Sequence, residues 1–142
     1  MYRILDLPQV PKELILPIEQ VLELENIFGG KSKNYTIHEV QDDLRVWLQK
    51  IFPNNIKFRY QTLVDGVPIH RDRGRDTALN YIIDTGGENV QTVWYDKDKV
   101  KITHSVILTS GVWHELQVNH YHTVTNIQGR RFAITVSNTA KL

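Results

Sequence analysis

Hydrophobic and polar positions follow different rhythms in the two parts of the chain, and the change comes near Pro53. Before Pro53, apolar residues recur at the three- and four-residue spacing that is typical of helices. After it, short β-rich runs are separated by turn residues, which is typical of strands. The pattern predicts a mainly β fold with N-terminal helices, of the α+β class, with the helical part over about 11–52 and the β core over about 56–137.

Two helices are predicted in the first part. The first runs from Pro17 to Phe28, because proline suits a first helical turn and Gly29-Gly30 suits a helix end. The second opens with Thr36 and Glu39, which have the spacing of a capping box. Its apolar face consists of Val40, Leu44, Trp47, Leu48 and Ile51. We expect this second helix to brace the sheet.

Six strands are predicted in the second part. They are Ile56–Leu63, Thr77–Asp84, Val90–Tyr95, Val100–Leu108, Trp113–His120 and Arg131–Val136. Between them lie pairs of favoured turn residues, Asp65-Gly66, Gly86-Gly87, Ser110-Gly111 and Gln128-Gly129. Short strands at this spacing indicate a sandwich or jelly roll.

Composition narrows the class of protein. The 142 residues suit one domain spanning 1–142, and no repeat or linker divides them. A chain with 41% hydrophobic and 23% charged residues is not intrinsically disordered. The formal net charge of +1 gives no basic field for a phosphate backbone, so nucleic acid is not the expected partner.

The absence of cysteine restricts the chemistry further. It excludes disulfides, thiolate zinc sites, iron–sulfur clusters and a cysteine nucleophile, so any metal must bind nitrogen and oxygen ligands. The segment Met1–Val10 lacks the apolar run of a signal peptide. No apolar stretch approaches the roughly 20 residues of a membrane helix. We therefore expect a cytoplasmic protein that does not associate with membranes.

One constellation of residues has the chemistry of a metal site. His70 and Asp72 are two positions apart, so on an extended backbone their side chains point to the same side. A His-x-Asp triplet alone is weak, because such triplets also occur in surface loops. His122 supplies a third donor fifty residues after Asp72. Two histidines and one carboxylate form the facial triad of non-haem Fe(II) oxygenases, in which open positions remain on the metal.

The segment that follows His122 strengthens the hypothesis that these three residues bind a metal. Arg131 stands nine residues after His122 and opens a predicted strand that ends at Val136. This arrangement resembles the closing segment of the prolyl 4-hydroxylase-like members of the Fe(II)/2-oxoglutarate-dependent oxygenase superfamily. The resemblance covers approximately Phe58 to Val136.

The resemblance implies a fold and an activity. The fold would be a double-stranded β-helix, and the cofactors would be Fe(II), 2-oxoglutarate as co-substrate, and O2. The enzyme would be a dioxygenase that hydroxylates a C–H bond of a protein, peptide or small-molecule substrate and releases succinate and CO2. A peptidyl prolyl residue is the first candidate for that substrate.

The resemblance also assigns roles around the metal. Arg131 would hold the distal carboxylate of 2-oxoglutarate, a task that suits a planar guanidinium able to form a bidentate pair. Tyr60 and Asn80 would contact the same co-substrate by family position. Ile82 or Ile83 stands where some relatives carry a second co-substrate tyrosine. Trp94 and Arg75 are weaker candidates for substrate contact.

Strand alternation makes a separate prediction for the strand that Arg131 opens. Alternate residues face opposite sides, so Arg131, Ala133 and Thr135 would face the pocket. Phe132, Ile134 and Val136 would pack on the other side of the sheet.

Two rival residues and two rival functions stay open. His120 competes with His122 as a ligand, and Arg130 competes with Arg131 as the buried cation. A cupin-type metalloenzyme would use the pair His120-x-His122, although Thr125 and Asn126 stand where cupins usually carry a glutamate. A non-catalytic jelly-roll binding module is the remaining alternative.

Overall fold

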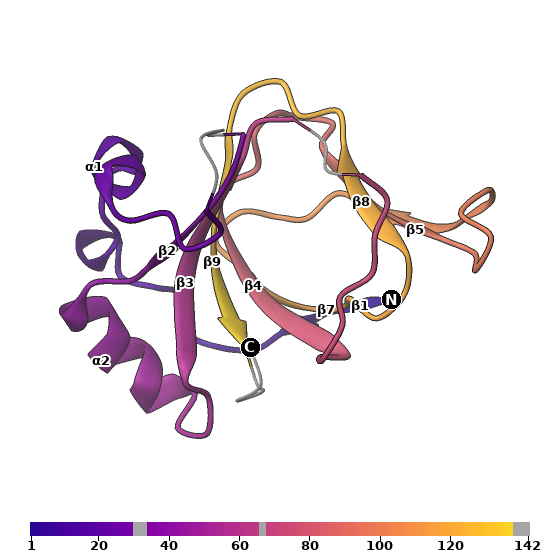
Figure 1. Cartoon of the computed structure of the whole chain (residues 1–142). Coiled ribbons are helices and arrows are strands. Elements are labelled where there is room, and N and C mark those ends of the chain that lie inside the picture. Colours follow the sequence, from indigo (N-terminus) through magenta and orange to yellow (C-terminus); the bar gives the residue numbers. More distant parts are fainter. Residues whose placement is uncertain (30–33, 66–67, 138–142) are drawn as a thin grey trace.

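The computed structural model describes residues 1–29, 34–65 and 68–137, and within them nine strands form two antiparallel sheets (Figure 1). The larger sheet has six strands in the order β1-β7-β4-β9-β3-β2. Their bounds are β1 Tyr2–Leu5, β2 Tyr35–Glu39, β3 Lys57–Leu63, β4 Thr77–Asp84, β7 Trp113–Gln117 and β9 Arg131–Ser137. The smaller sheet has the order β6-β5-β8, with β5 Gln91–Tyr95, β6 Ile102–Val106 and β8 His122–Thr125.

The arrangement is the jelly roll with N-terminal helices that the sequence predicts. Figure 1 shows α1 (Ile18–Glu23) and α2 (Asp42–Ile51) on one side of the larger sheet, with β5 and β8 of the smaller sheet on the other side. A short 3-10 turn, η1, spans Lys12–Leu14. Among the described residues, no helix is long and apolar enough to cross a membrane.

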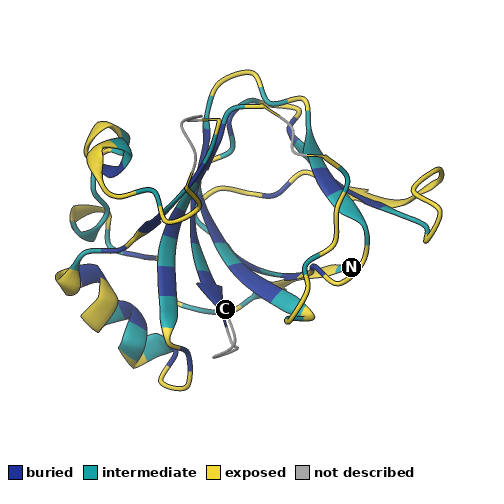
Figure 2. Cartoon of the chain, in the orientation of Figure 1, coloured by how far each residue is buried: buried dark blue, intermediate teal, exposed yellow. Residues whose placement is uncertain are grey.

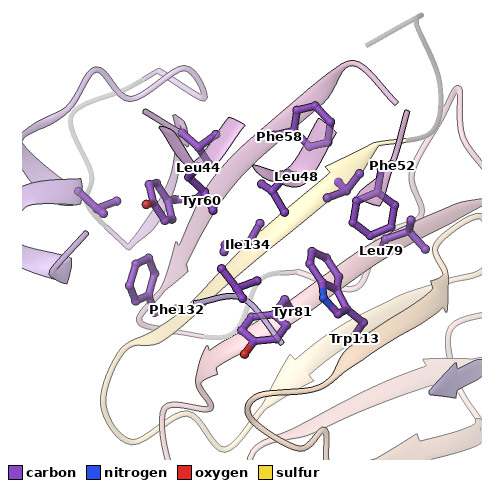
Figure 3. Close-up of a cluster of buried hydrophobic side chains, with 14 residues drawn as sticks. Leu44, Leu48, Phe52, Phe58, Tyr60, Leu79, Tyr81, Trp113, Phe132 and Ile134 are labelled. Carbon is purple, nitrogen blue, oxygen red and sulfur yellow. The ribbon is translucent and has the colours of Figure 1, made fainter. Parts of the chain in front are cut away.

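The main hydrophobic core lies between the helices and the larger sheet (Figure 3). Helix α2 contributes Leu44 and Leu48, both fully buried. Full burial of a leucine side chain stabilises a fold by about 1.5–3 kcal/mol. Trp113 of β7 packs edge-on against Phe52, with 4.9 Å between the ring centroids. The second helix therefore braces the sheet, as predicted.

The strand β9 shows the predicted alternation. Phe132, Ile134 and Val136 belong to the core under the helices. Arg131 and Thr135 line a cavity on the opposite face of the sheet. Figure 2 shows buried bands along β3, β4 and β9, the strands at the centre of the larger sheet. One face of this sheet thus packs against the helices, and the other face lines the cavity.

The predicted capping box at Thr36 and Glu39 is wrong. These residues lie in β2, which pairs antiparallel with β3, and helix α2 begins only at Asp42. Thr36 is buried, and its hydroxyl is hydrogen-bonded to that of Thr62 across the two strands. A Thr-x-x-Glu spacing fits a strand as well as a cap, and the pairing partner in β3 decides between them.

The first helix is shorter than predicted, ending at Glu23 rather than Phe28. The chain beyond it bonds to β2: Ile27 donates its amide to the Ile37 carbonyl at 2.7 Å, and the Ile37 amide donates to Asn26 Oδ1 at 3.0 Å. These contacts replace the helical hydrogen bonds of that segment.

The remaining differences concern strands and turns. The strands β1, β2 and β8 were not predicted, and the predicted strands Val100–Leu108 and Trp113–His120 are shorter, as β6 and β7. Gly30 and Gly66, two of the predicted turn glycines, lie outside the described residues.

Candidate metal centre

The three predicted ligands lie together. The side-chain donor atoms of His70, Asp72 and His122 are all within 4.8 Å of one another. Asp72 Oδ1 is 3.6 Å from His70 Nε2 and 3.9 Å from His122 Nε2. His120 is exposed and does not belong to this cluster. The geometry therefore groups His122, and not its rival, with the other two donors.

Backbone hydrogen bonds hold the ligands in place. The amide of His70 donates to the carbonyl of His122 at 3.1 Å, and the amide of His122 donates to the carbonyl of His70 at 2.8 Å. Asp72 is tied separately, since its amide donates to the Val118 carbonyl at 2.7 Å. The cluster thus joins two segments that are fifty residues apart, as the metal prediction requires.

Both imidazoles have the orientation that metal binding would require. His70 Nδ1 donates to the Pro68 carbonyl at 2.8 Å, and His122 Nδ1 donates to the His120 carbonyl at 2.7 Å. Because a carbonyl only accepts, the proton of each neutral ring lies on Nδ1 and leaves the Nε2 lone pair facing Asp72. Burial lowers the pKa of His122 and favours this neutral form.

Arg75 contacts the carboxylate of the cluster. Its Nε and Nη2 lie 2.8 and 2.7 Å from Asp72 Oδ2. We predicted Arg75 as a weak candidate for substrate contact, and the structure gives its guanidinium a partner within the protein.

A cavity of about 90 Å³ adjoins the three ligands. A water-sized group occupies roughly 10–15 Å³ on this measure, so the cavity suits a small acid and not a peptide. Its walls come from both sheets and include Tyr35, Gln61, Asn80, Thr92, Trp94 and Arg131. The cavity brings the predicted metal ligands and the predicted cation into one enclosure.

Arg131 is the buried cation of this cavity. It is 7% exposed, and burial lowers its pKa to about 10, so it stays charged at neutral pH. Within the described residues its guanidinium has no hydrogen-bond or ion-pair partner. Its rival Arg130 instead donates to the hydroxyl of Thr62 at 3.2 Å. Since a buried charge is costly unless it is paired, Arg131 is suited to receive an anion.

The start of β9 is fixed by a close backbone approach. A Cβ atom on Gly86 would lie 3.0 Å from the Arg131 backbone nitrogen, and Gly86 has a φ of +87°. Only glycine combines this conformation with such proximity at low cost. The turn residue predicted from Gly86-Gly87 therefore helps to place Arg131.

Two other polar side chains of the cavity have unused hydrogen-bonding capacity. Asn80 Oδ1 and Thr92 Oγ1 are buried and have no partner among the described residues. Trp94 also lines the cavity, but its indole donates to the Gln117 carbonyl at 2.8 Å. Asn80 is thus where the resemblance puts it, and Trp94 serves as a wall of the cavity.

Tyr60 does not reach the cavity, contrary to prediction. It is buried in the core under the helices, where its hydroxyl donates to Gln41 Oε1 at 2.7 Å and accepts from the Leu16 amide at 3.2 Å. Alternation along β3 is the reason: Gln61 faces the cavity, so its neighbour Tyr60 faces the helices.

A tyrosine that we did not predict takes part in the site. Tyr35 of β2 lines the cavity, and its hydroxyl accepts a hydrogen bond from Gln61 Nε2 at 2.9 Å. Burial raises the pKa of its phenol, which stays protonated. Reading 35–39 as an alternating strand would have placed Tyr35 opposite the buried Thr36.

A wider cavity, of about 520 Å³, meets the first one at the metal ligands. It shares Tyr35, Leu63, His70 and Asp72 with the small cavity and extends to Phe28 and Pro68. A molecule too large for the inner cavity could therefore lie beside His70 and Asp72.

Comparison with known proteins shows the fold alone. No protein-family profile and no curated protein matches the sequence. An oxalate decarboxylase structure superposes with a TM-score of 0.52 at 14% identity. The superposed part covers 84% of this chain and only 29% of the oxalate decarboxylase chain. A prolyl-4-hydroxylase from Pseudomonas putida superposes with a TM-score of 0.51 at 15% identity, covering 96% of this chain and 89% of that one. The shared architecture is the jelly roll.

Proposed function

We propose that the protein is an Fe(II)- and 2-oxoglutarate-dependent oxygenase that hydroxylates a C–H bond and releases succinate and CO2. The observation that carries the proposal is the buried guanidinium of Arg131, which has no ion-pair partner among the described residues and lines the same cavity as His70, Asp72 and His122. A metal triad alone would fit many metalloenzymes. A triad and an unpaired cation in one small cavity fit an acid that reaches both.

The donor set fits the proposed metal. Two imidazole nitrogens and one carboxylate oxygen are the ligands of the facial triad that binds Fe(II) in non-haem oxygenases, and His70, Asp72 and His122 would supply them. Iron with the bound keto acid supplies the oxidative chemistry with O2. The protein's own task is to orient the reactants and exclude water.

The cavity residues would orient the co-substrate. Arg131 would pair with its distal carboxylate. Thr92 offers a hydroxyl, Asn80 offers a buried amide oxygen, and the proton of the Tyr35 phenol has no acceptor among the described residues. The oxygen atoms of a small acid would accept hydrogen bonds from the Thr92 and Tyr35 hydroxyls, whereas the Asn80 amide oxygen, itself an acceptor, would need a donor.

The substrate would enter from the wider cavity. That cavity is large enough for a side chain of a peptide and borders His70 and Asp72 directly. A peptidyl prolyl residue is our first candidate, supported by the sequence resemblance and by the fold shared with the P. putida prolyl-4-hydroxylase. A small molecule is the alternative substrate.

Anaerobic titration tests the proposal. Fe(II) and 2-oxoglutarate are added to the metal-free protein, and the visible charge-transfer band of the chelate is measured. We expect the band with both components and not with either alone. Its absence in the folded protein would sink the proposal.

A cupin-type metalloenzyme acting on a small carboxylic acid is the second candidate. The fold that the chain shares with an oxalate decarboxylase favours it. Thr125 and Asn126 in place of the usual cupin glutamate count against it. Metal-dependent consumption of oxalate, without any charge-transfer band from 2-oxoglutarate, would favour this candidate over the oxygenase.

A further inference from the structure

The two oxygens of the Asp72 carboxylate have different surroundings. Oδ2 accepts a hydrogen bond from Arg75 Nε at 2.8 Å and forms an ion pair with Nη2 at 2.7 Å. Oδ1 faces the two imidazoles, at 3.6 Å from His70 Nε2 and 3.9 Å from His122 Nε2. One oxygen is therefore engaged by the protein, and the other points to the metal position.

The loop that carries both residues is fixed by its backbone. Gly74 has a φ of +89°, a conformation that favours glycine and turns the chain so that Arg75 returns to Asp72. The Asp72 amide donates to the Val118 carbonyl at 2.7 Å, and the Val118 amide donates to the Asp76 carbonyl at 2.9 Å. The two side chains are each 19% exposed, so little water competes for the pair.

We infer that Arg75 is a positioning residue that limits Asp72 to one ligating oxygen and so keeps a metal coordination position open for the chelating acid. A carboxylate can bind a metal through one oxygen or through both. If both oxygens of Asp72 bound, only two positions of a six-coordinate ion would stay open, so the keto acid and O2 would compete for them. The inference rests on the proposed function and adds to it a residue that controls how the acid binds.

Two effects determine the result of removing Arg75. Loss of its positive charge removes a repulsion of the metal ion, and loss of its N–H donors frees Oδ2 to coordinate. Both effects favour metal binding by the metal-free protein. Both also disfavour the incoming acid, because fewer coordination positions are open to it and a nearby cation is gone. Arg75 is therefore expected to lower the affinity for the metal and to raise the affinity for the co-substrate.

Cobalt(II) titration of the full chain tests this. We compare the wild type, Arg75→Ala, Arg75→Lys and the control Arg73→Ala, which alters an exposed arginine of the same loop. For Arg75→Ala we expect Co(II) affinity equal to or above that of the wild type, a weaker d–d absorption that reports a higher coordination number, and binding of 2-oxoglutarate weakened by about 10-fold or more. Arg75→Lys and Arg73→Ala should resemble the wild type.

Several outcomes separate this inference from the proposed function. Failure of the wild type to bind Co(II) and 2-oxoglutarate would overturn the proposed function. An Arg75→Ala protein with an unchanged spectrum and unchanged 2-oxoglutarate affinity would overturn the role of Arg75 alone. So would a loss of Co(II) affinity with normal 2-oxoglutarate binding, since Arg75 would then only orient Asp72. If Arg75→Ala does not fold, Arg75→Met keeps the apolar stem and is measured in its place.

Discussion

His70 and His122 exchange a pair of backbone hydrogen bonds, at 3.1 and 2.8 Å, although fifty-two residues separate them in the sequence. Each imidazole is then oriented by a carbonyl two residues earlier in the chain. The ligand geometry is thus set by main-chain contacts, and removing a histidine side chain leaves the backbone bridge intact.

Substitution of the two neighbouring histidines distinguishes the ligand from its rival. His122→Ala removes a metal donor, so we expect Fe(II) or Co(II) affinity to fall by more than about 100-fold, beyond the range for outer-shell residues. His120→Ala keeps the carbonyl that orients His122 and should change affinity little. The measurement is metal titration of both variants, with thermal unfolding to check the fold. Equal losses in the two variants would contradict the assignment of His122.

Arg131→Met should separate stability from co-substrate binding. Methionine fills a similar volume without a charge, so it removes a buried cation that has no ion-pair partner among the described residues. We expect the free energy of unfolding of the metal-free protein to rise by about 1–4 kcal/mol, while 2-oxoglutarate no longer stabilises the protein. Urea unfolding with and without 2-oxoglutarate and metal measures both effects.

The matched control is Arg130→Met, which alters the adjacent arginine that bonds Thr62. This control should retain stabilisation by 2-oxoglutarate. If Arg131→Met retained it and Arg130→Met lost it, the two arginines would have exchanged roles.

Local rules predicted some parts of the site well. The spacing of His70 and Asp72 and the alternation along β9 depend only on the two-residue period of an extended chain, and both hold in the structure. The same rule says that only one of Arg130 and Arg131 can face the cavity, and the family resemblance chose Arg131 between them. Site residues whose positions depend only on strand alternation can therefore be predicted from the sequence before the fold is known.

The residues that the sequence did not place correctly depend on pairing between strands that are distant in the chain. The face on which Tyr60 lies depends on how β3 packs under the helices, and its distance of ten residues from His70 does not determine that. β2 is a strand because β3 lies beside it, and Thr36–Glu39 reads equally well as a helix start. Tyr35 was missed for the same reason. These residues needed the partner strand, which no local pattern specifies.

His114 gives the fold a dependence on pH. It is 1% exposed, and its pKa is lowered first by burial and further by the charge of Arg131, while a hydrogen bond with the Val112 backbone opposes the shift. An unfolded histidine has a pKa of about 6.5, so below that pH the unfolded chain binds the proton more readily than the folded one. Its contribution to stability is therefore present above about pH 6.5 and is lost as the pH falls toward the lowered pKa of the folded state.

His114→Gln should accordingly reduce the loss of stability between about pH 7.5 and about pH 5.5. Urea midpoints at the two pH values measure this loss. His104→Gln, at an exposed position of β6, is the control and should lose as much stability as the wild type. If His114→Gln showed the full wild-type loss, other groups would account for the pH dependence.

The hydroxyl of Tyr60 should stabilise the fold and that of Tyr35 should bind the co-substrate, and a pair of phenylalanine substitutions tests this. Tyr60→Phe leaves Gln41 and the Leu16 amide without their partner in the core, so the free energy of unfolding should fall by about 1–3 kcal/mol while 2-oxoglutarate affinity is unchanged. Tyr35→Phe removes a hydroxyl of the cavity, so 2-oxoglutarate affinity should fall by about 10- to 100-fold, as for a lost hydrogen bond to a charged group. Calorimetric titration with 2-oxoglutarate and urea unfolding on the same two variants give both quantities. Weakened co-substrate binding in Tyr60→Phe alone would show that the core tyrosine reaches the acid after all, and that the Tyr35 hydroxyl does not bind it.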